Sequence, residues 1–412
     1  MPSFQPSARI LIIVALLGLG SGCATMKGWF GGSKEKPGEP AELVEIAGAL
    51  QTKAAWTQKL GDGHRRLGLR THPVIEGERA YVVDDAGRVK AVSLATGDVL
   101  WEQQAVASQT SLTGRVFFWR KKIIENGLTS TPAVGNGMVI VGGRNGEVVA
   151  LDADSGAERW KATVSSEVLA APLITPDRII VRSNDGRVHA LDPANGSRKW
   201  VFDRGLPSLT VRGSSAAVAG QGAVYVGYDD GSVIVLRLED GARGWEQSVA
   251  DPDGRTELDR MADIDGEMQV GLNELYAVSF HDRMMSISTA NGRPLWTRDV
   301  GSHTGLAMLA DRLLVSDKAG TVWAIDRSNG SALWKQDVFT NRWLTTPAVH
   351  GDFAVVGDIE GYLHWIRIAT GEIAARVRLD KAAILATPQV SIDGMLVAQS
   401  VEGKVAAYPL PQ

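Results

Sequence analysis

GEVVALDADSGAERW, residues 146–160, is the stretch that decides the fold, because it returns along the chain. It recurs as GRVHALDPANGSRKW at 186–200 and as GTVWAIDRSNGSALW at 320–334. Each copy begins with a glycine, has a second glycine ten residues later and a tryptophan fourteen residues later. Looser copies begin at positions 87, 231, 282, 361 and 403, with Asp282 replacing a first glycine and Ala375 replacing a tryptophan. The eight starts lie about 45 residues apart, which is the period of a four-stranded propeller blade.

Within each copy, the residues have the pattern of antiparallel strands joined by tight turns. An apolar run such as 148–151 follows the first glycine, and an Asp/Asn-x-Gly turn then supplies the positive-φ residue that a hairpin needs. The tryptophan is expected to begin the next strand. The pattern therefore predicts an all-β fold, an eight-bladed β-propeller of four-stranded antiparallel blades. Prolines stand where first strands should start, since a missing N–H costs no ladder bond there, at Pro73, Pro132, Pro172, Pro347 and Pro388.

The two ends of the repeat array are complementary. The eighth copy stops before its tryptophan, whereas AAWTQKLG at 54–61 has the pattern of a strand without a blade. We expect this N-terminal strand to complete the last blade and close the ring, because closure removes the open edge of the array. We also expect the repeat tryptophans to be wedged between blades rather than to form a ligand cage. They are Trp56, Trp101, Trp160, Trp200, Trp245, Trp296 and Trp334.

The N-terminal residues have the pattern of an export signal followed by a lipid-attachment cysteine. Arg9 precedes an apolar run at 10–19, which is shorter than the roughly 20 residues of a membrane-spanning helix. Small residues then lead to Cys23, the single cysteine, as in a bacterial lipoprotein signal with Gly20 where Leu is usual. Ala24 after the cysteine suggests sorting to the outer membrane. We expect a signal peptide at 1–22, an acylated Cys23 beginning a flexible tether at 23–40, and the propeller at 41–412.

Composition argues against several classes of function. With 43 basic and 47 acidic residues the formal charge is −4, without the basic excess of a general nucleic-acid-binding protein. One cysteine rules out a disulfide framework, and the seven histidines are scattered without a His-x-x-x-His pair. No nucleophile–base pair and no phosphate-binding loop is recognisable. We therefore expect no catalysis, no metal, no cofactor and no nucleic acid.

The repeat pattern Ala-x-Asp-x-x-x-Gly-x-x-x-Trp resembles the repeats of pyrroloquinoline-quinone (PQQ) dehydrogenases, which are eight-bladed propellers, over residues 41–412. Those enzymes usually place adjacent cysteines beneath the quinone and hold calcium through Glu, Asn and Asp. This chain has no cysteine pair, because its single cysteine is Cys23 at the expected lipid-attachment position. A PQQ-dependent dehydrogenase-like quinoprotein is the alternative reading.

A lipoprotein signal followed by eight such repeats resembles more closely the BamB family of outer-membrane assembly lipoproteins. LPSLTVRGSS at 206–215 is similar to the family's Pro-Ser-Leu-x-Leu-Arg-Gly-x-Ser segment, with Val211 for Leu. ELDRMADID at 257–265 is similar to its Ile/Leu-Asp-Arg-x-x-Asp-x-Asp segment. After it the chain departs from the family, with GEMQ at 266–269 in place of a Thr-Pro strand start.

This resemblance implies a non-enzymatic scaffold of the β-barrel assembly (BAM) complex at the periplasmic face of the outer membrane. Such a scaffold binds the POTRA domains of the barrel protein BamA, joins other BAM members and assists the assembly and insertion of nascent β-barrel proteins. The contact residues that the resemblance implies are Leu209, Val211, Arg212, Asp263 and Asp265. Apolar side chains beside an arginine suit an interface anchor, and carboxylates steer a basic partner.

Simpler readings of these segments remain open from the residues alone. Leu209 and Val211 could belong to a strand that faces a blade interface, and Asp263 and Asp265 to a turn. An insertion at 102–130 enlarges the first repeat and contains VFFWRKK at 116–122. It could contact a partner or the membrane surface, or be a strand with a longer loop.

Overall fold

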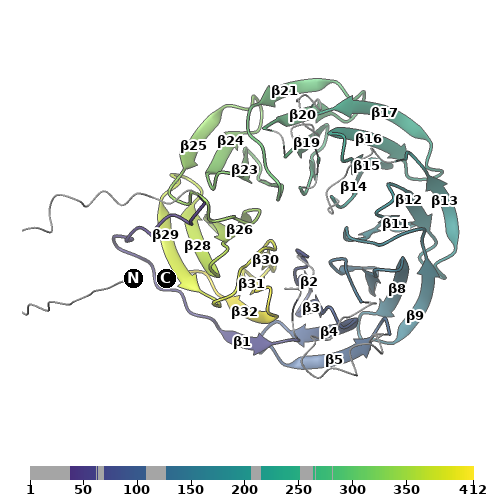
Figure 1. The fold of residues 1–412 in the computed structure, drawn as a ribbon, viewed down its shortest axis with the longest axis horizontal. Coiled ribbons are helices and arrows are strands. Elements are labelled where there is room, and N and C mark those ends of the chain that lie inside the picture. Colours follow the sequence, from purple (N-terminus) through teal and green to yellow (C-terminus); the bar gives the residue numbers. More distant parts are fainter. Residues whose placement is uncertain are drawn as a thin grey trace, which may run out of the picture. The chain divides into compact units, whose positions relative to one another are not determined.

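Four-stranded antiparallel sheets arranged around a ring make up the described chain within the compact unit Pro40–Gln412 (Figure 1). The computed structural model describes residues 38–61, 63, 69–107, 127–205, 215–250, 263–264, 266–280 and 282–412. In these residues there are eight sheets, so the predicted eight-bladed propeller is confirmed. None of these residues belongs to a helix long and apolar enough to cross a membrane.

In each blade the first strand is innermost and the fourth forms the outer wall (Figure 1). Blades 1 to 4 consist of β2 (Val74–Glu76), β3 (Arg79–Val83), β4 (Arg88–Ser93) and β5 (Val99–Gln104); β6 (Ala133–Gly135), β7 (Met138–Gly142), β8 (Glu147–Asp152) and β9 (Glu158–Thr163); β10 (Leu173–Ile174), β11 (Ile179–Arg182), β12 (Val188–Leu191) and β13 (Arg198–Phe202); and β14 (Val218–Gly220), β15 (Ala223–Gly227), β16 (Ser232–Arg237) and β17 (Arg243–Ser248).

Blades 5 to 8 continue the ring in chain order, and the last one borrows its outer strand from the N-terminal region. They consist of β18 (Gln269–Val270), β19 (Glu274–Val278), β20 (Met284–Ser288) and β21 (Pro294–Arg298); β22 (Leu306–Met308), β23 (Arg312–Ser316), β24 (Val322–Asp326) and β25 (Ala332–Gln336); β26 (Ala348–His350), β27 (Phe353–Gly357), β28 (Tyr362–Arg367) and β29 (Ile373–Arg378); and β30 (Gln389–Val390), β31 (Leu396–Gln399), β32 (Lys404–Tyr408) and β1 (Trp56–Lys59).

Ring closure takes place as the sequence predicts. Strand β1 pairs antiparallel with β32, with Trp56 opposite Ala407 and Lys59 opposite Lys404. The five strand-start prolines each directly precede the first strand of a blade. One detail of the prediction is wrong: a repeat tryptophan such as Trp101 lies inside its strand, because the strand already starts at Val99.

The first glycine of the repeat forms the turn between the second and third strands of a blade. Gly146 has a φ of 81°, and a Cβ atom there would lie 2.5 Å from the carbonyl oxygen of Val164. Asp282 takes the same place with a φ of 48°. Aspartate tolerates this left-handed conformation better than most side chains, which explains why it can replace the glycine.

The buried apolar side chains form clusters that are shared by neighbouring blades. One cluster joins Val89 of blade 1 to Val139 of blade 2, and another joins Val188 of blade 3 to Val224 of blade 4. The propeller therefore has its apolar core at the seams between blades rather than at the centre of the ring.

At the seams, each repeat tryptophan lies against a hairpin glycine of the next blade. A Cβ atom at Gly196 would lie 2.5 Å from the ring of Trp160, and Trp160 Nε1 donates a hydrogen bond to the carbonyl of Pro193 at 2.8 Å. The glycine keeps the space for the ring and also adopts the positive φ of the turn, 71°. The pairs are Trp56–Gly97, Trp101–Gly156, Trp160–Gly196, Trp200–Gly241, Trp245–Gly292, Trp296–Gly330 and Trp334–Gly371.

Blade 7 has Ala375 at the tryptophan position because the neighbouring blade has no hairpin there. Blade 8 receives its outer strand from β1, so no turn glycine follows β32. The tryptophan is instead on the third strand, where Trp365 pairs with Ala375 and packs edge-on against Tyr408 of blade 8 at 5.8 Å. Leu50, from the residues before β1, packs against the same cluster.

Two glycines of blade 4 allow the seam contact to be separated from backbone strain. Gly241 (φ 72°) would place a Cβ atom 2.6 Å from Trp200, whereas Gly222 (φ 74°) has open space around it. We expect Gly222→Ala to cost about 1–2 kcal/mol of unfolding free energy from the positive φ alone. Gly241→Ala should cost about 1–3 kcal/mol more from overpacking. Urea denaturation of both variants measures the difference, and equal losses would show that Trp200 does not need the glycine.

Candidate functional site

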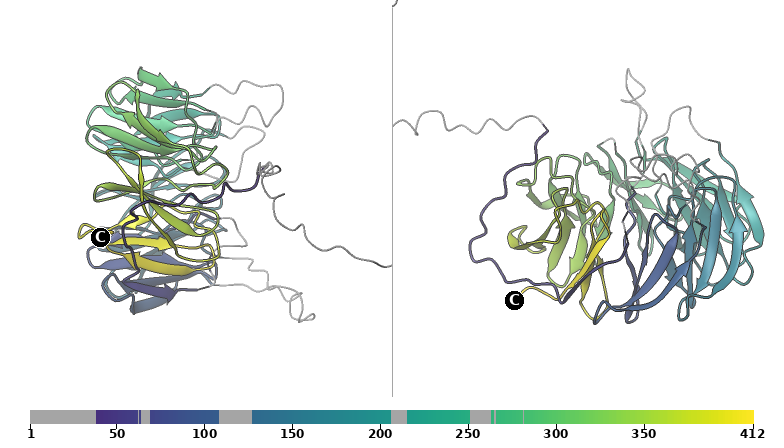
Figure 2. Two further views of the ribbon diagram at one scale, coloured as in Figure 1. Left: turned by 90° about the vertical axis from the view of Figure 1, so that its left-hand side faces the viewer. Right: turned by 60° about the horizontal axis from the view of Figure 1, so that its bottom comes forward.

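Alternating strand directions divide the turns of the propeller between its two faces (Figure 2). One face carries the connections between blades together with the turns between second and third strands, and we call it the connection face. The opposite face carries the remaining hairpins. The connection between blades 3 and 4 is 203–217, and that between blades 4 and 5 is 249–268. Both predicted partner-binding segments therefore start and end on the connection face.

Of the predicted partner-binding residues, only Asp263 is described. Leu209, Val211, Arg212 and Asp265 lie outside the described residues, as does most of the insertion at 102–130. The site is therefore defined by the residues that flank the two segments. These are Arg204 and Ser215 for the first segment, and Asp263 and Ile264 for the second.

Tyr228, in the turn after β15, lies between two arginines of blade 3. The guanidinium of Arg182 is 5.1 Å from the centre of the Tyr228 ring, and that of Arg204 is 4.8 Å from it. Such cation–π contacts contribute most when they are desolvated. Burial raises the pKa of Tyr228 to about 12, while the two arginines act in the opposite direction. The ring stays neutral and holds the seam between blades 3 and 4.

Both arginines are fixed by acidic groups of the same turn. Arg182 Nη2 lies 2.8 Å from Asp229 Oδ1 in a buried ion pair. Arg204 Nη2 lies 2.7 Å from Asp230 Oδ2 and also pairs with Glu246. Because Arg204 is two residues before position 206, these bonds fix the point from which the first segment leaves blade 3.

The far ends of the two segments meet at the same turn. Ile264 N–H donates to the carbonyl of Tyr228 at 3.3 Å. A Cβ atom on Gly227 would lie 2.6 Å from Ile264 and 2.9 Å from the hydroxyl of Ser215. Glycine is required at 227 because the residues that close the two segments both pack on it. The fold therefore brings the two predicted segments to one place.

Asp263 is 3% exposed, and its carbonyl accepts a hydrogen bond from Phe280 N–H at 2.9 Å. This position ties the end of the second segment to blade 5. A buried carboxylate cannot reach a partner as freely as an exposed one, so the position favours a supporting role for Asp263.

Sequence reasoning missed Arg182, Arg204 and Tyr228. Arg182 and Tyr228 belong to different copies of the repeat and meet only across a blade seam. The one available signal was the place of Arg204, directly before the segment at 206–215.

The residues before β1 form a strap along the outer wall of blade 7 (Figures 1 and 2). Ala41 N–H donates to the carbonyl of Thr340 at 2.9 Å, and Leu50 N–H to that of Ala374 at 2.8 Å. Gln51 and Gln412 exchange two backbone hydrogen bonds. The strap, residues 41–55, leads from the connection face to the start of the ring-closing strand.

A buried polar cluster of blade 7 holds the strap. Arg342 Nη1 donates to the carbonyl of Ala41 at 2.6 Å, while its Nε donates to Asp358 at 2.8 Å. Arg376 Nη1 donates to the carbonyl of Val44 at 2.9 Å, and its Nε donates to His364 Nδ1 at 3.1 Å. His364 therefore accepts at Nδ1 and donates from Nε2 to Asp358. Burial lowers the pKa of His364, although Asp358 acts against this, so the ring is neutral.

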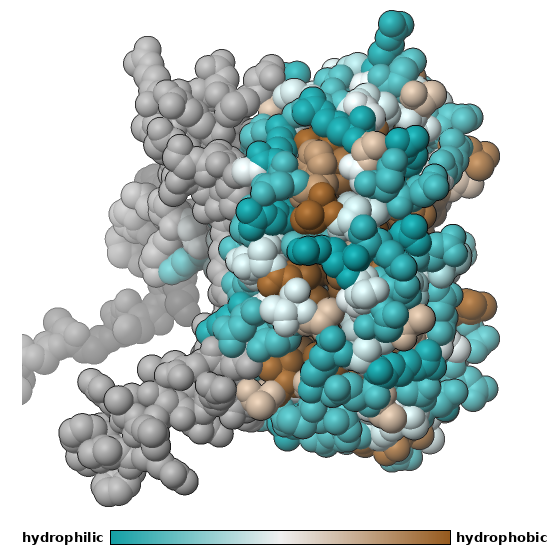
Figure 3. All heavy atoms as spheres, turned by 90° about the vertical axis from the view of Figure 1, so that its right-hand side faces the viewer, coloured by the Kyte–Doolittle hydropathy of each residue, from teal (hydrophilic) through white to brown (hydrophobic). Residues whose placement is uncertain are grey.

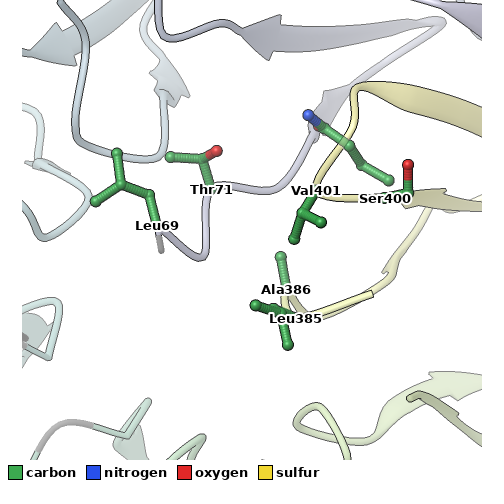
Figure 4. A pocket seen from close by; sticks show the side chains of 7 residues that line it. Leu69, Thr71, Leu385, Ala386, Ser400 and Val401 are labelled. Carbon is green, nitrogen blue, oxygen red and sulfur yellow. The ribbon is translucent and has the colours of Figure 1, made fainter. Parts of the chain in front are cut away.

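A small pocket lies where the connection from blade 8 to blade 1 meets blade 8 (Figure 4). The space in it that is open to the centre of a water molecule is only about 10 Å³, and no charged side chain lines it. Sites for small molecules usually measure about 300–1,000 Å³ and carry a few convergent polar groups. Leu69, Thr71, Leu385, Ala386, Gln399, Ser400 and Val401 line it.

The outer wall in the view of Figure 3 is mostly hydrophilic, with apolar side chains in separate clusters. Among the described residues, no group of three or more His, Cys, Asp or Glu side chains is placed to hold a metal ion.

The fold and this site define an eight-bladed propeller in which ion pairs of Arg204 fix the start of the connection between blades 3 and 4. A sequence profile described as "Outer membrane protein assembly factor BamB" matches residues 42–117 and 112–336. A protein of that name from Xanthomonas campestris pv. campestris is 43% identical over 97% of both chains, and one from Escherichia coli K12 is 34% identical over 96% of both. The chain belongs to the BamB family.

Solved structures agree with this assignment. The crystal structure of BamB from Moraxella catarrhalis superimposes with a TM-score of 0.75 at 26% identity, covering 87% of this chain and all of that one. The quinohemoprotein alcohol dehydrogenase of Comamonas testosteroni gives a TM-score of 0.67 at 14% identity, over 87% of this chain and 76% of that one. This second likeness shows the fold alone.

Replacement of Tyr228 tests the seam beside the predicted segments. Tyr228→Leu removes the ring from between the two arginines, and we expect a loss of about 2–4 kcal/mol of unfolding free energy. Tyr228→Phe keeps the ring and should change stability by less than about 1 kcal/mol at pH 7, since the hydroxyl has no hydrogen-bond partner in the described structure. Between about pH 10 and 12 the unaltered chain should lose more stability than Tyr228→Phe, because the pKa of the Tyr228 hydroxyl is raised on folding. Equal losses for both variants at pH 7 would contradict the role of the ring.

Proposed function

We propose that this protein is a non-enzymatic scaffold lipoprotein of the BAM complex. It binds the POTRA domains of BamA, joins other BAM members, and assists the assembly and insertion of nascent β-barrel proteins into the outer membrane. Family membership supports this role, since relatives over the whole chain carry the name of outer membrane protein assembly factors.

One observation carries the proposed binding surface: the two family-type segments end on one turn. Ser215 and Ile264 both pack on Gly227, and Arg204 is bonded to the same turn through Asp230. Segments separated by more than 40 residues in the sequence can therefore act on one partner. A partner that bridges them would contact blades 3, 4 and 5 at the connection face.

Each predicted residue has a role in this proposal. Leu209 and Val211 supply apolar contacts, and Arg212 supplies a planar cation for a carboxylate or an exposed carbonyl of the partner. Asp265 steers a basic partner. Asp263 is buried, so its role is to hold the end of the second segment in place rather than to contact the partner.

We further propose that the chain is anchored through Cys23 to the periplasmic face of the outer membrane. The signal peptide comprises residues 1–22, the tether residues 23–40 and the propeller residues 41–412. Bonds of the strap to Arg342 and Arg376 support this arrangement, because a pulled tether needs a firm attachment to the ring.

The quinoprotein alternative is not favoured by the residues present. The likeness between quinoprotein dehydrogenases and this chain is one of fold alone. The single cysteine, Cys23, cannot supply the adjacent cysteine pair that those enzymes usually use. The described residues likewise do not assemble an acidic group for a calcium ion.

Alanine substitutions test the binding surface. We expect Leu209→Ala and Arg212→Ala each to weaken POTRA binding by about 1–3 kcal/mol, the range of interface anchors. Thermal stability should hardly change. Asp265→Ala should slow association and reduce its salt dependence, whereas Asp263→Ala should lower the melting temperature. Arg237→Ala is a matched control, because this exposed arginine pairs with Asp240 on the opposite face. Normal binding by Arg212→Ala, or loss of binding by Arg237→Ala, would contradict the surface.

Replacement of the cysteine tests the anchor. The unaltered chain expressed in a diderm bacterium should incorporate a labelled palmitate analogue and fractionate with the outer membrane. Cys23→Ser should carry no label, because the thiol is the only acylation point proposed. An unlabelled wild-type chain, or a labelled Cys23→Ser chain, would refute the lipid anchor.

A further inference from the structure

We propose that Trp343 is a second anchor for the protein partner, on the connection face between blades 6 and 7. This inference deepens the proposed scaffold role and rests on it. It extends the contact surface from the two segments beside blade 4 along an arc of inter-blade connections to an exposed indole. The partner is expected to offer an apolar pocket that receives the indole.

Trp343 combines high exposure with an unfavourable backbone conformation. Its side chain is 58% exposed, the largest aromatic group among the exposed apolar residues of the described structure. Its φ of 51° lies in the left-handed region, which is unfavourable for a bulky residue. An exposed ring adds little to a core, so neither feature is explained by the stability of the fold. Conformations of this kind are retained mostly at functional sites.

The residues on either side force this conformation and turn the indole outward. Arg342 is 1% exposed and is bonded to Asp358, and Leu344 is also 1% exposed and belongs to the core between blades 6 and 7. With both neighbours buried, the side chain of Trp343 is directed to the solvent between them. The ring is held in place before any partner arrives, so little conformational entropy is lost on binding.

One side of the indole meets His303, from the connection between blades 5 and 6. The two ring centres are 6.0 Å apart at an interplanar angle of 72°. Burial lowers the pKa of His303 to about 4, and nearby Arg70 acts in the same direction. The imidazole is therefore neutral at pH 7. Arg70 donates to the carbonyl of His303, which places a cation beside the neutral aromatic pair.

Hydrogen bonds join this place to the predicted binding segments. Glu267, four residues after Asp263, pairs in parallel with Gly305, and Glu267 N–H donates to the carbonyl of Thr304 at 3.2 Å. The hydroxyl of Thr346 donates to the same Thr304 carbonyl at 2.7 Å. The second binding segment, the His303 connection and the Trp343 connection are thus neighbours on one face.

These surroundings define the chemistry of the occupant. An indole beside a neutral imidazole suits an apolar pocket in a protein, and tryptophan is the residue type most enriched at interface anchors. Continuity with the second segment makes the same POTRA-containing partner the occupant, because a partner seated on blades 3 to 5 reaches Trp343 by extending over the neighbouring His303 connection.

The test uses the whole chain with Trp343→Gly and Trp343→Asn, because both residues tolerate the left-handed conformation. Leu295→Ala removes a 55% exposed apolar side chain from the outer wall and is the matched control. Calorimetric titration with the POTRA domains of the same organism's BamA should show about 10- to 100-fold weaker binding for both Trp343 variants. Their melting temperatures should be unchanged or higher, and Leu295→Ala should bind normally.

The outcomes separate this inference from the proposed function. Normal binding by both Trp343 variants together with weak binding by Arg212→Ala overturns the inference and leaves the function standing. Normal binding by Arg212→Ala and Leu209→Ala with weak binding by Trp343→Gly overturns the proposed contact residues and supports the anchor. A fall of several degrees in the melting temperature of both Trp343 variants assigns the ring a structural role. A changed sedimentation coefficient of the Trp343 variants assigns the ring to a contact between two copies of the chain. Loss of flotation with anionic vesicles in these variants assigns it to a lipid contact.

Discussion

The contact between a tryptophan of one blade and a hairpin glycine of the next is the constraint on which this propeller depends. The apolar core lies at the seams, so the ring has no central core to hold its blades in place. Each indole fills the space over a glycine and donates its N–H to a carbonyl of the next blade, as Trp160 does to Pro193. A buried tryptophan is thereby both packed and hydrogen-bonded. In register on its own blade, Trp160 faces the small Ala150, which leaves room for the ring.

The chain termini modify this rule at one seam. Strand β1 enters blade 8 from the N-terminal region, so the hairpin that would receive an indole from position 375 does not exist. The large and small partners are exchanged there, with Trp365 on the third strand and Ala375 on the fourth. The strap and the ring closure are thus parts of one arrangement. Arg342 connects them to the face that carries the inter-blade connections, because it bonds both Ala41 and Asp358.

The same geometry makes the connection face suitable for the proposed partner binding. Strand pairing leaves little freedom to the blades, but each connection crosses a seam and can vary without disturbing a sheet. Around Tyr228, a part-buried ion pair of Arg204 positions one connection, and a backbone hydrogen bond from Ile264 positions the next. At Trp343, the two buried neighbours impose an unfavourable backbone conformation. At both places the backbone that would contact a partner is held in one conformation before the partner binds.

The sequence by itself determined the number of blades, the strand and turn pattern and the seam tryptophans, because these recur in successive copies of one repeat. It also determined the closing strand, because the last copy stops short of its tryptophan. It also indicated the family, through segments outside the repeat. Only the tertiary structure decided that Ser215 and Ile264 meet at Gly227, that Arg182 and Arg204 enclose Tyr228, and that Asp263 is buried. These contacts join different blades, and no periodicity within one copy records which side chains of two copies will meet. The exchange of Trp365 and Ala375 was likewise hidden, since it follows from where the chain ends meet in space.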